Sequence, residues 1–149
     1  MKTFTTITSL FALFSSALAA PVDTAEADGT TVSVSYDTTY DVSGTSLTTV
    51  ACSDGSNGLI TKGYTTFGSL PGFPNIGGAP TIPGWNSPNC GKCYALTYNG
   101  KTINVLAVDA APGGFNLGLQ AMNSLTDNQA EQLGRIDATY TEVDVGLCK

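Results

Sequence analysis

Residues 94–108 read YALTYNGKTINVLAV, two runs rich in β-branched and aromatic residues on either side of Asn99-Gly100. Asn and Gly tolerate the positive φ angles of a tight turn, so this stretch predicts a β-hairpin. The second run continues into Asp109 and a glycine-rich turn, AAPGG at 110–114. The hairpin therefore delivers a carboxylate to the end of an apolar strand, next to a tight turn.

Four further segments have the patterns of strands. Residues 31–36, TVSVSY, alternate β-branched and polar residues, which is typical of a half-buried strand. Residues 138–147 alternate in the same way and predict the last strand, whereas 47–52 and 63–67 are weaker candidates. We therefore expect a chain built mainly of short strands.

Helical spacing is confined to one part of the chain. Between residues 115 and 125, apolar residues recur at Leu117, Ala121 and Leu125 and predict a helix. The following segment, from Thr126 as N-cap to Gln129, fits a capping box and predicts a second short helix that ends near residue 133. Short strands with one helical interruption predict a mainly β fold, a small barrel with a helical excursion.

The N-terminal region has the features of a targeting segment. Residues 1–20 begin with Lys2, continue with an apolar run and end in Ala17-Leu18-Ala19, which predicts a secretory signal peptide. The run is too short and too interrupted by Ser and Thr for a membrane anchor. Residues 21–30 are acidic without periodicity and predict a disordered leader or pro-segment, so the folded domain is expected over 31–149.

Composition narrows the classes of partner. The chain has 149 residues, a net charge of −6 and only 12% charged residues. A pI near 4.2 argues against binding to nucleic acid and to anionic membranes, both of which need basic patches. A neutral partner such as a polysaccharide remains compatible with this composition.

The four cysteines, at 52, 90, 93 and 148, include one C-x-x-C pair. A structural zinc site needs paired clusters of Cys or His ligands, and a redox pair opens a helix, whereas this pair leads into a strand. In a secreted chain an even count favours disulfides. A bridge between Cys90 and Cys93 would leave both long segments unconstrained, whereas pairing each with a distant cysteine would close them.

The chain has no histidine, which removes Ser-His-Asp triads, Cys-His dyads and most catalytic metal sites. No glycine-rich nucleotide-binding motif joins a strand to a helix, so the sequence does not indicate a nucleotide cofactor. With no His and a single Cys pair, it does not indicate a metal either. Acid–base chemistry remains, but Asp109 has no second carboxylate in a comparable setting. Asp109 is equally consistent with a cap that accepts backbone N–H bonds in the turn.

Several long motifs resemble those of the cerato-platanin family of small secreted fungal proteins, and together they cover about residues 31–149. The motifs are VSVSYD (32–37), CSDGSNGL (52–59), LPGFPNIGG (70–78), GWNSPNCGKC (84–93), VLAVDAAPGGFN (105–116), AMNSLT (121–126) and LGRIDATY (133–140). The resemblance implies a six-stranded double-psi β-barrel related to expansin and to family-45 endoglucanases. It also implies the bridges Cys52–Cys90 and Cys93–Cys148.

The resemblance further implies a function. Family members are secreted or held in the fungal wall, elicit plant defence or act as antigens and allergens, and bind chitin-type N-acetylglucosamine oligomers. Some loosen cellulose without hydrolysing it. The family groove residues match Asp109 and the segment Gly113, Gly114, Phe115 and Asn116, whereas many members have His where this chain has Ala110.

Our leading hypothesis is therefore a non-catalytic carbohydrate-binding protein without a cofactor, acting outside the cell or in the fungal wall. Asp109 and Asn116 would bond sugar hydroxyls, and Tyr36, Phe115 or Trp85 would give apolar contact. We expect a monomer that can self-assemble at interfaces and can be perceived by a host receptor. The alternatives are a weak glycoside hydrolase and a surface-active coat protein.

Overall fold

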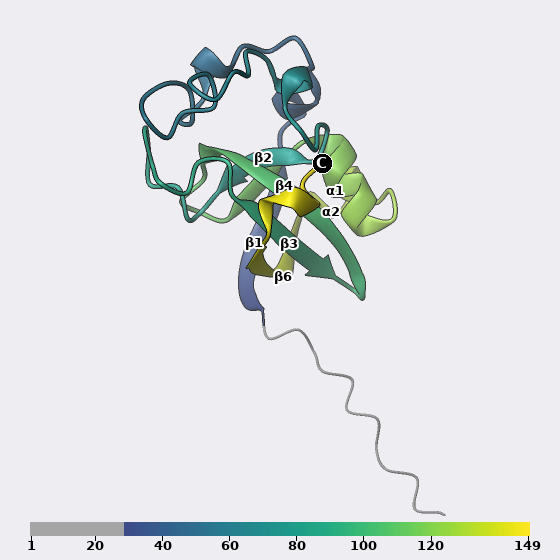
Figure 1. Cartoon of the computed structure of the whole chain (residues 1–149). Helices are drawn as coiled ribbons and strands as arrows, with labels where there is room; N and C mark the ends of the chain where they lie inside the picture. The colour runs from purple at the N-terminus through teal and green to yellow at the C-terminus, as the bar shows by residue number, and fades with distance from the viewer. Residues whose placement is uncertain (1–28) are drawn as a thin grey trace, which may run out of the picture.

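The computed structural model describes residues 29–149 (Figure 1). The predicted signal peptide, 1–20, and residues 21–28 of the predicted leader lie outside the described residues. No helix within 29–149 is long and apolar enough to span a membrane.

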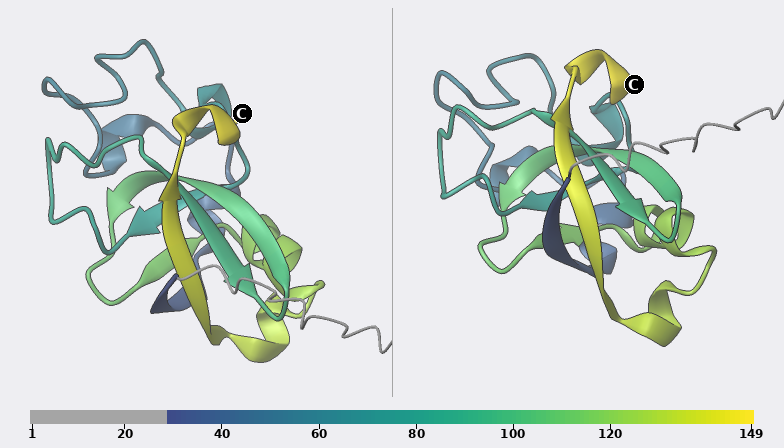
Figure 2. Two further views of the ribbon diagram at one scale, coloured as in Figure 1. Left: turned by 60° about the horizontal axis from the view of Figure 1, so that its bottom comes forward. Right: turned by 90° about the horizontal axis from the view of Figure 1, so that it is seen from below.

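Six strands close into a barrel in the order β1-β5-β2-β4-β3-β6 (Figures 1 and 2). They are β1 (Thr30–Tyr36), β2 (Ile76–Ala79), β3 (Cys93–Tyr98), β4 (Lys101–Ala110), β5 (Phe115–Leu117) and β6 (Arg135–Val143). The β1/β5 and β2/β4 pairs are parallel, and the other pairs are antiparallel. The expected six-stranded barrel is confirmed, and its two parallel pairs fit the double-psi arrangement.

Helical structure lies outside the barrel wall. The helices α1 (Leu119–Thr126) and α2 (Ala130–Leu133) lie to one side of the barrel, and long loops before and after β2 form a layer over another side (Figure 1). The remaining helical segments are the 3-10 turns η1 (Thr38–Asp41), η2 (Leu47–Thr49), η3 (Phe67–Ser69) and η4 (Val145–Leu147). The loop layer and β4 together determine the surroundings of Asp109.

The predicted hairpin is confirmed as β3 and β4, with Thr97 paired to Thr102 across the turn. Asn99 has φ 46° and Gly100 has φ 78°, the left-handed values that a two-residue turn of this type requires. The predicted first strand is confirmed as β1, and the last strand begins earlier than expected, at Arg135. Residues 145–147 of its expected range form η4 instead.

Three predictions about the loop region are wrong. Residues 47–52 do not form a strand, because Ser46 caps a 3-10 turn by accepting a hydrogen bond from the Thr48 N–H. Residues 63–67 contribute only an isolated bridge between Ser46 and Thr66. The segment read as loop instead contains β2, whose sequence, IGGA, has too few side chains to produce a strand pattern.

The helix prediction is wrong at its start. Residues 115–117 form β5, and α1 begins only after Gly118. The Asp41 carboxylate accepts hydrogen bonds from the N–H groups of Leu119 (2.7 Å) and Gln120 (2.9 Å), which caps α1 from a distant part of the chain. No local sequence pattern reports a cap that lies 78 residues away.

The second helix is shorter than predicted, and Thr126 is not its N-cap residue. Thr126 ends α1, and its hydroxyl donates to the Met122 carbonyl (2.8 Å). The same hydroxyl accepts a hydrogen bond from the Gln129 N–H (3.3 Å), as the capping-box pattern predicts. The first N–H of α2, from Ala130, is instead bonded to the Asn123 side chain (3.1 Å).

Two disulfides join the loop layer and the C-terminus to the barrel. Cys52 is bonded to Cys90 and Cys93 to Cys148, the pairing that the resemblance implies. They close segments of 38 and 55 residues, and on the chain-entropy model each stabilises the fold by about 4 kcal/mol. The C-x-x-C pair is therefore the junction of two structural bridges.

Candidate functional site

The candidate site is a row of residues that strand register places side by side across five strands. Gly78 on β2 is paired with both Asp109 on β4 and Asn116 on β5. Asn116 is paired with Ser35 on β1, and Ser35 with Arg135 on β6. Directly paired residues point to the same face of a sheet, so we call these five residues the polar row.

Small residues keep the middle of the polar row open. A Cβ added to Gly78 would lie 2.8 Å from the Cβ of Ala111, closer than side-chain carbon atoms approach. Gly114 has φ 131° and lies against the Ser33 carbonyl, so it also cannot bear a side chain. A hollow of about 210 Å³ opens beside them, lined by Ser35, Gly113, Gly114, Phe115, Asn116 and Arg135.

At one end of the polar row, polar groups face the hollow. The Ser35 hydroxyl donates to the Asn116 side-chain oxygen at 3.1 Å, which fixes the orientation of the amide. Among residues 29–149 the Asn116 NH₂ group donates to no protein atom. The Arg135 guanidinium donates to the Ser33 hydroxyl at 2.7 Å and uses only one of its donors in this way. This end therefore keeps donors for a ligand.

At the other end, the Asp109 carboxylate is already bonded to protein groups. One oxygen accepts hydrogen bonds from the N–H groups of Ala51 and Ala110, both at 2.8 Å, and the other accepts from the Tyr40 hydroxyl at 3.1 Å. Ala51 and Tyr40 belong to the loop layer. Asp109 thus fastens this layer to β4 and retains little acceptor capacity for a ligand.

The pKa values at this end fit a structural role. Burial, followed by the charge of Asp109, raises the pKa of Tyr40 far above its ordinary value of 10, so its hydroxyl stays protonated and remains a donor. Asp37, whose charge also reaches Tyr40, has its pKa lowered by hydrogen bonds from Thr39. Neither group is prepared to donate a proton to a substrate at neutral pH.

Two of the predicted sugar-contacting aromatics belong to the barrel interior. Phe115 is only 1% exposed, and its ring packs edge-on against Tyr94 and Tyr140 at centroid distances of 5.5 and 5.2 Å. Tyr36 is half-buried against the core and follows Ser35 on β1, so its side chain points to the opposite face from the polar row. The structure brings neither ring to the polar row.

Trp85 is exposed but lies in the loop layer. Its side chain is 63% accessible, and the indole N–H donates to the Asp54 carboxylate at 2.7 Å. It is not among the residues that line the hollow of the polar row. The sequence predicted one site from residues that the structure divides between the polar row, the core and this loop.

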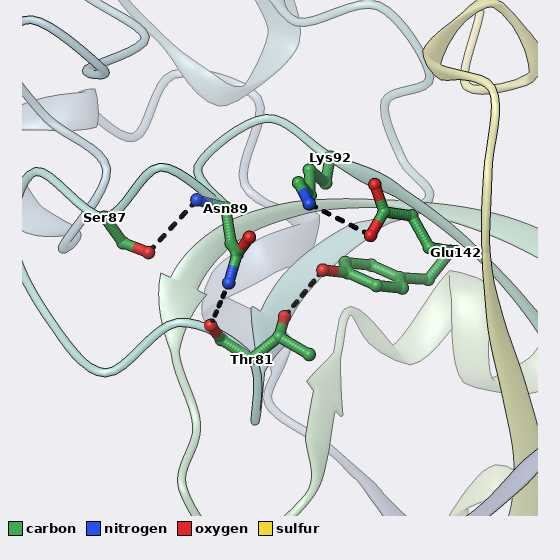
Figure 3. Close-up of polar contacts among 6 residues, drawn as sticks. Thr81, Ser87, Asn89, Lys92 and Glu142 are labelled. Carbon is green, nitrogen blue, oxygen red and sulfur yellow. Dashed lines mark hydrogen bonds and ion pairs between the residues drawn. The ribbon is translucent and has the colours of Figure 1, made fainter.

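The loop that carries Trp85 is held at its base by polar contacts (Figure 3). The Asn89 amide donates to the Thr81 carbonyl at 2.6 Å, and the Asn89 N–H donates to the Ser87 hydroxyl at 3.1 Å. Lys92 forms an ion pair with Glu142 on β6 at 3.0 Å. These contacts orient the loop without connecting Trp85 to the polar row.

Ala110 stands where the family resemblance implies a histidine in many members. Ala110 follows Asp109 directly on β4, and its side chain packs partly against the core. Successive side chains in a strand point to opposite faces, so the residue at 110 does not point into the polar row. Ala110 therefore contributes no side chain to the polar row.

No cluster that could hold a metal emerges from this geometry. Within residues 29–149 no group of three or more His, Cys, Asp or Glu side chains is gathered in space, and the four cysteines are consumed by disulfides. The chemistry that the polar row offers is hydrogen bonding from an amide, a guanidinium, a hydroxyl and one carboxylate. Such a set suits a neutral, polyhydroxylated ligand.

Comparison with known proteins agrees with the barrel. The family model described as Cerato-platanin matches residues 32–149. The chain belongs to the cerato-platanin family. This cerato-platanin is 49% identical in sequence to cerato-platanin 1 from M. perniciosa, whose crystal structure is known. The structural match covers 79% of this chain and 99% of the other, with a TM-score of 0.77.

Two relatives of this cerato-platanin have immunological names. It is 62% identical to Allergen Asp f 15 of Aspergillus fumigatus over 97% of this chain and 96% of the relative. It is 49% identical to the Heat-stable 19 kDa antigen of Coccidioides immitis over 94% of this chain and 96% of that protein.

Sequence reasoning missed Ser35, Gly78, Arg135 and Tyr40. The first three become neighbours only through barrel register, which a single sequence does not reveal for strands as short as β2 and β5. A faint signal existed for Ser35, a polar residue on the outward face of an alternating strand. Tyr40 belongs to none of the strand, helix or turn patterns that the sequence contains.

Proposed function

We propose that this protein is a secreted, non-enzymatic carbohydrate-binding member of its family, and that it binds N-acetylglucosamine oligomers through the polar row. The observation that carries the proposal is the free Asn116 amide beside the Arg135 guanidinium, facing a hollow of about 210 Å³. Sugar hydroxyl and acetamido groups accept hydrogen bonds from such donors.

Charge supports a neutral ligand over a charged one. Within the polar row, Arg135 and Asp109 carry opposite charges and lie at opposite ends. An anion would meet the carboxylate, and a cation would meet the guanidinium. A neutral ligand bound at the Asn116 and Arg135 donors would meet neither conflict.

The carboxylates support binding without hydrolysis. Glycosidases use two carboxyl groups, one of which has a raised pKa so that it can protonate the leaving oxygen. Asp37 is the other carboxylate whose charge acts on Tyr40 beside Asp109, and its pKa is lowered. Loosening of cellulose would then follow from competition for chain–chain hydrogen bonds, with no covalent step.

The relatives' names support a role in host perception. An Aspergillus relative that aligns with 97% of this chain is called an allergen. A Coccidioides relative that aligns with 94% of it is called an antigen. Together with the predicted signal peptide, this favours a protein outside the cell or in the fungal wall that acts as an antigen or elicitor. Recognition by a host receptor and self-assembly at interfaces belong to the same proposal.

Calorimetric titration with chitin and cellulose oligomers tests this function. Asn116→Ala should weaken binding about five- to tenfold, because one or two hydrogen bonds are lost. Gln132→Ala, which truncates an exposed amide on α2, is the matched control and should bind like the wild type.

A reducing-sugar assay on the same mixtures should stay at background. Equal affinity of Asn116→Ala and the wild type would exclude the polar row as the site. Release of reducing ends that disappears in Asp109→Asn would instead establish a hydrolase.

A further inference from the structure

A second regular feature of the barrel lies on the strand ends away from the loop layer. Thr102 on β4 is paired with Thr97 on β3, Thr97 with Thr139 on β6, and Thr139 with Thr31 on β1. We call these four residues the threonine rank. Strands are about 4.8 Å apart, so three steps make a rank about 14 Å long.

The four side chains point outward on one face. The Thr97 and Thr102 hydroxyls are hydrogen-bonded to each other at 2.7 Å. Thr31, Thr97 and Thr139 line a common hollow of about 390 Å³, larger than the hollow beside the polar row. β-branched side chains are stiff at χ1, so these hydroxyls are held in place before any ligand arrives.

The chemistry of this hollow restricts its ligand. Besides the threonines it is lined by Tyr98, by the Asn99-Gly100 turn and by Asp137, whose side chain is exposed. No Lys or Arg lines it, so an anion would meet only the carboxylate of Asp137. Hydroxyl groups both donate and accept hydrogen bonds, which matches a neutral ligand rich in hydroxyls.

The threonine rank is continuous with the polar row along two adjacent strands, β1 and β6 (Figure 2). Three register pairs form this connection: Ser35 with Arg135, Ser33 with Asp137, and Thr31 with Thr139. The intervening residues Val34, Ile136 and Ala138 are buried in the barrel. The outward surface from 135 to 139 is therefore polar throughout and about 13 Å long.

We propose that the threonine rank is a second contact region for the same polysaccharide chain, which would lie along β1 and β6 and contact the polar row and the threonine rank together. This inference rests on the proposed function, because it needs a sugar in the polar row. It predicts that affinity grows with chain length, since only a longer oligomer reaches both regions.

The test compares N-acetylglucosamine disaccharide and hexamer by calorimetry with the wild type and Thr97→Val/Thr139→Val. Valine keeps the branched shape and removes the hydroxyls. We expect the double variant to lose about five- to tenfold in hexamer affinity, the effect of one or two hydrogen bonds, and to bind the disaccharide within about twofold of wild type. Thr65→Val, at an exposed threonine of the loop layer, is the control.

Thr139→Ser, which retains a hydroxyl, should keep the hexamer affinity. If the double variant does not fold, Thr139→Val alone should lower hexamer affinity about threefold, the effect of one weak hydrogen bond. Unchanged hexamer affinity in a folded variant would overturn the inference. So would a change in self-association by sedimentation without a change in sugar binding, which would make the rank a contact between copies.

Failure of the proposed function has a different signature. In that case Asn116→Ala would bind both oligomers like the wild type, or no oligomer would bind. If only the inference fails, Asn116→Ala lowers the affinity for both oligomers, and the threonine variants lower the affinity for neither.

Discussion

Asp109 and Asn116 lie two strands apart in the polar row, and they differ in how far protein groups already satisfy their hydrogen-bonding capacity. Asp109 accepts three hydrogen bonds from protein groups, two of them from the loop layer. Asn116 uses its oxygen for Ser35, and its NH₂ group meets no protein acceptor within residues 29–149. Both side chains are half-buried, so exposure alone does not distinguish them.

Of the two residues, the one that is more conspicuous in the sequence has the structural role. A carboxylate at the end of an apolar strand attracts attention in a sequence, but this one stabilises the loop layer. The Asn116 amide, two strands away, does not hold the loop layer, and its NH₂ group can donate to a ligand. Mutations of Asp109 and of Asn116 should therefore separate effects on stability from effects on binding.

The largest expected effect is the loss of stability in Asp109→Ala. It leaves the Tyr40 hydroxyl and the Ala51 N–H without their acceptor, which should lower the free energy of unfolding by about 3 kcal/mol. Urea denaturation measures this. Asp137→Ala removes an exposed carboxylate and should cost less than about 0.5 kcal/mol. If Asp109→Ala were stable but no longer bound sugar, Asp109 would be a binding residue and not a structural one.

Tyr40→Phe should have the next largest effect, since it removes one donor to the Asp109 carboxylate and keeps the ring that stacks on Phe67. We expect a loss of about 1–2 kcal/mol at neutral pH, typical of a hydrogen bond to a charged group. Thermal unfolding provides the measurement, and Tyr98→Phe, whose hydroxyl has no bonded protein partner among the described residues, is its control.

The same tyrosine predicts how stability changes at alkaline pH. In the unfolded chain Tyr40 loses its proton above pH 10, whereas the raised pKa keeps it protonated in the folded state. Proton loss thus favours unfolding, and stability falls as the pH rises above 10 by up to about 1.4 kcal/mol per pH unit from this group. Urea denaturation at pH 9, 10 and 11 should show that the free energy of unfolding falls less steeply with pH in Tyr40→Phe than in the wild type. Parallel slopes would contradict the pKa shift.

Asn116→Ala should leave stability nearly intact. Only the bond from Ser35 is lost, so we expect a change of less than about 1 kcal/mol, together with the five- to tenfold loss of sugar affinity. Denaturation and calorimetry on one preparation give both values. If stability fell as far as in Asp109→Ala, Asn116 and Asp109 would not differ as proposed.

The smallest effect is expected for Trp85→Phe. Its single side-chain hydrogen bond, to Asp54, is exposed, so the loss of stability should be below about 0.5 kcal/mol. Binding at the polar row should be unchanged, because Trp85 does not line its hollow. Calorimetry with the hexamer checks this, and a large loss would place the sugar on the loop layer.

The sequence predicted the β3/β4 hairpin, β1 and most of β6, because alternation and an Asn-Gly turn are local signals. It missed β2, since IGGA has few side chains to form a pattern, and it read β5 as the start of a helix. Asp109 stood out as a carboxylate at the end of an apolar strand, whereas Gly113, Gly114 and Asn116 came from the family resemblance. Their neighbours Ser35 and Arg135 depend on long-range register, which no local pattern contains.

The most direct test of the central claim is a ¹⁵N NMR titration of the protein with N-acetylglucosamine hexamer. We expect the side-chain amide signals of Asn116 and the backbone signals of Gly113 and Ser35 to shift together, while the indole N–H signal of Trp85 stays in place. Shifts at the Trp85 indole with a stationary Asn116 amide would contradict it.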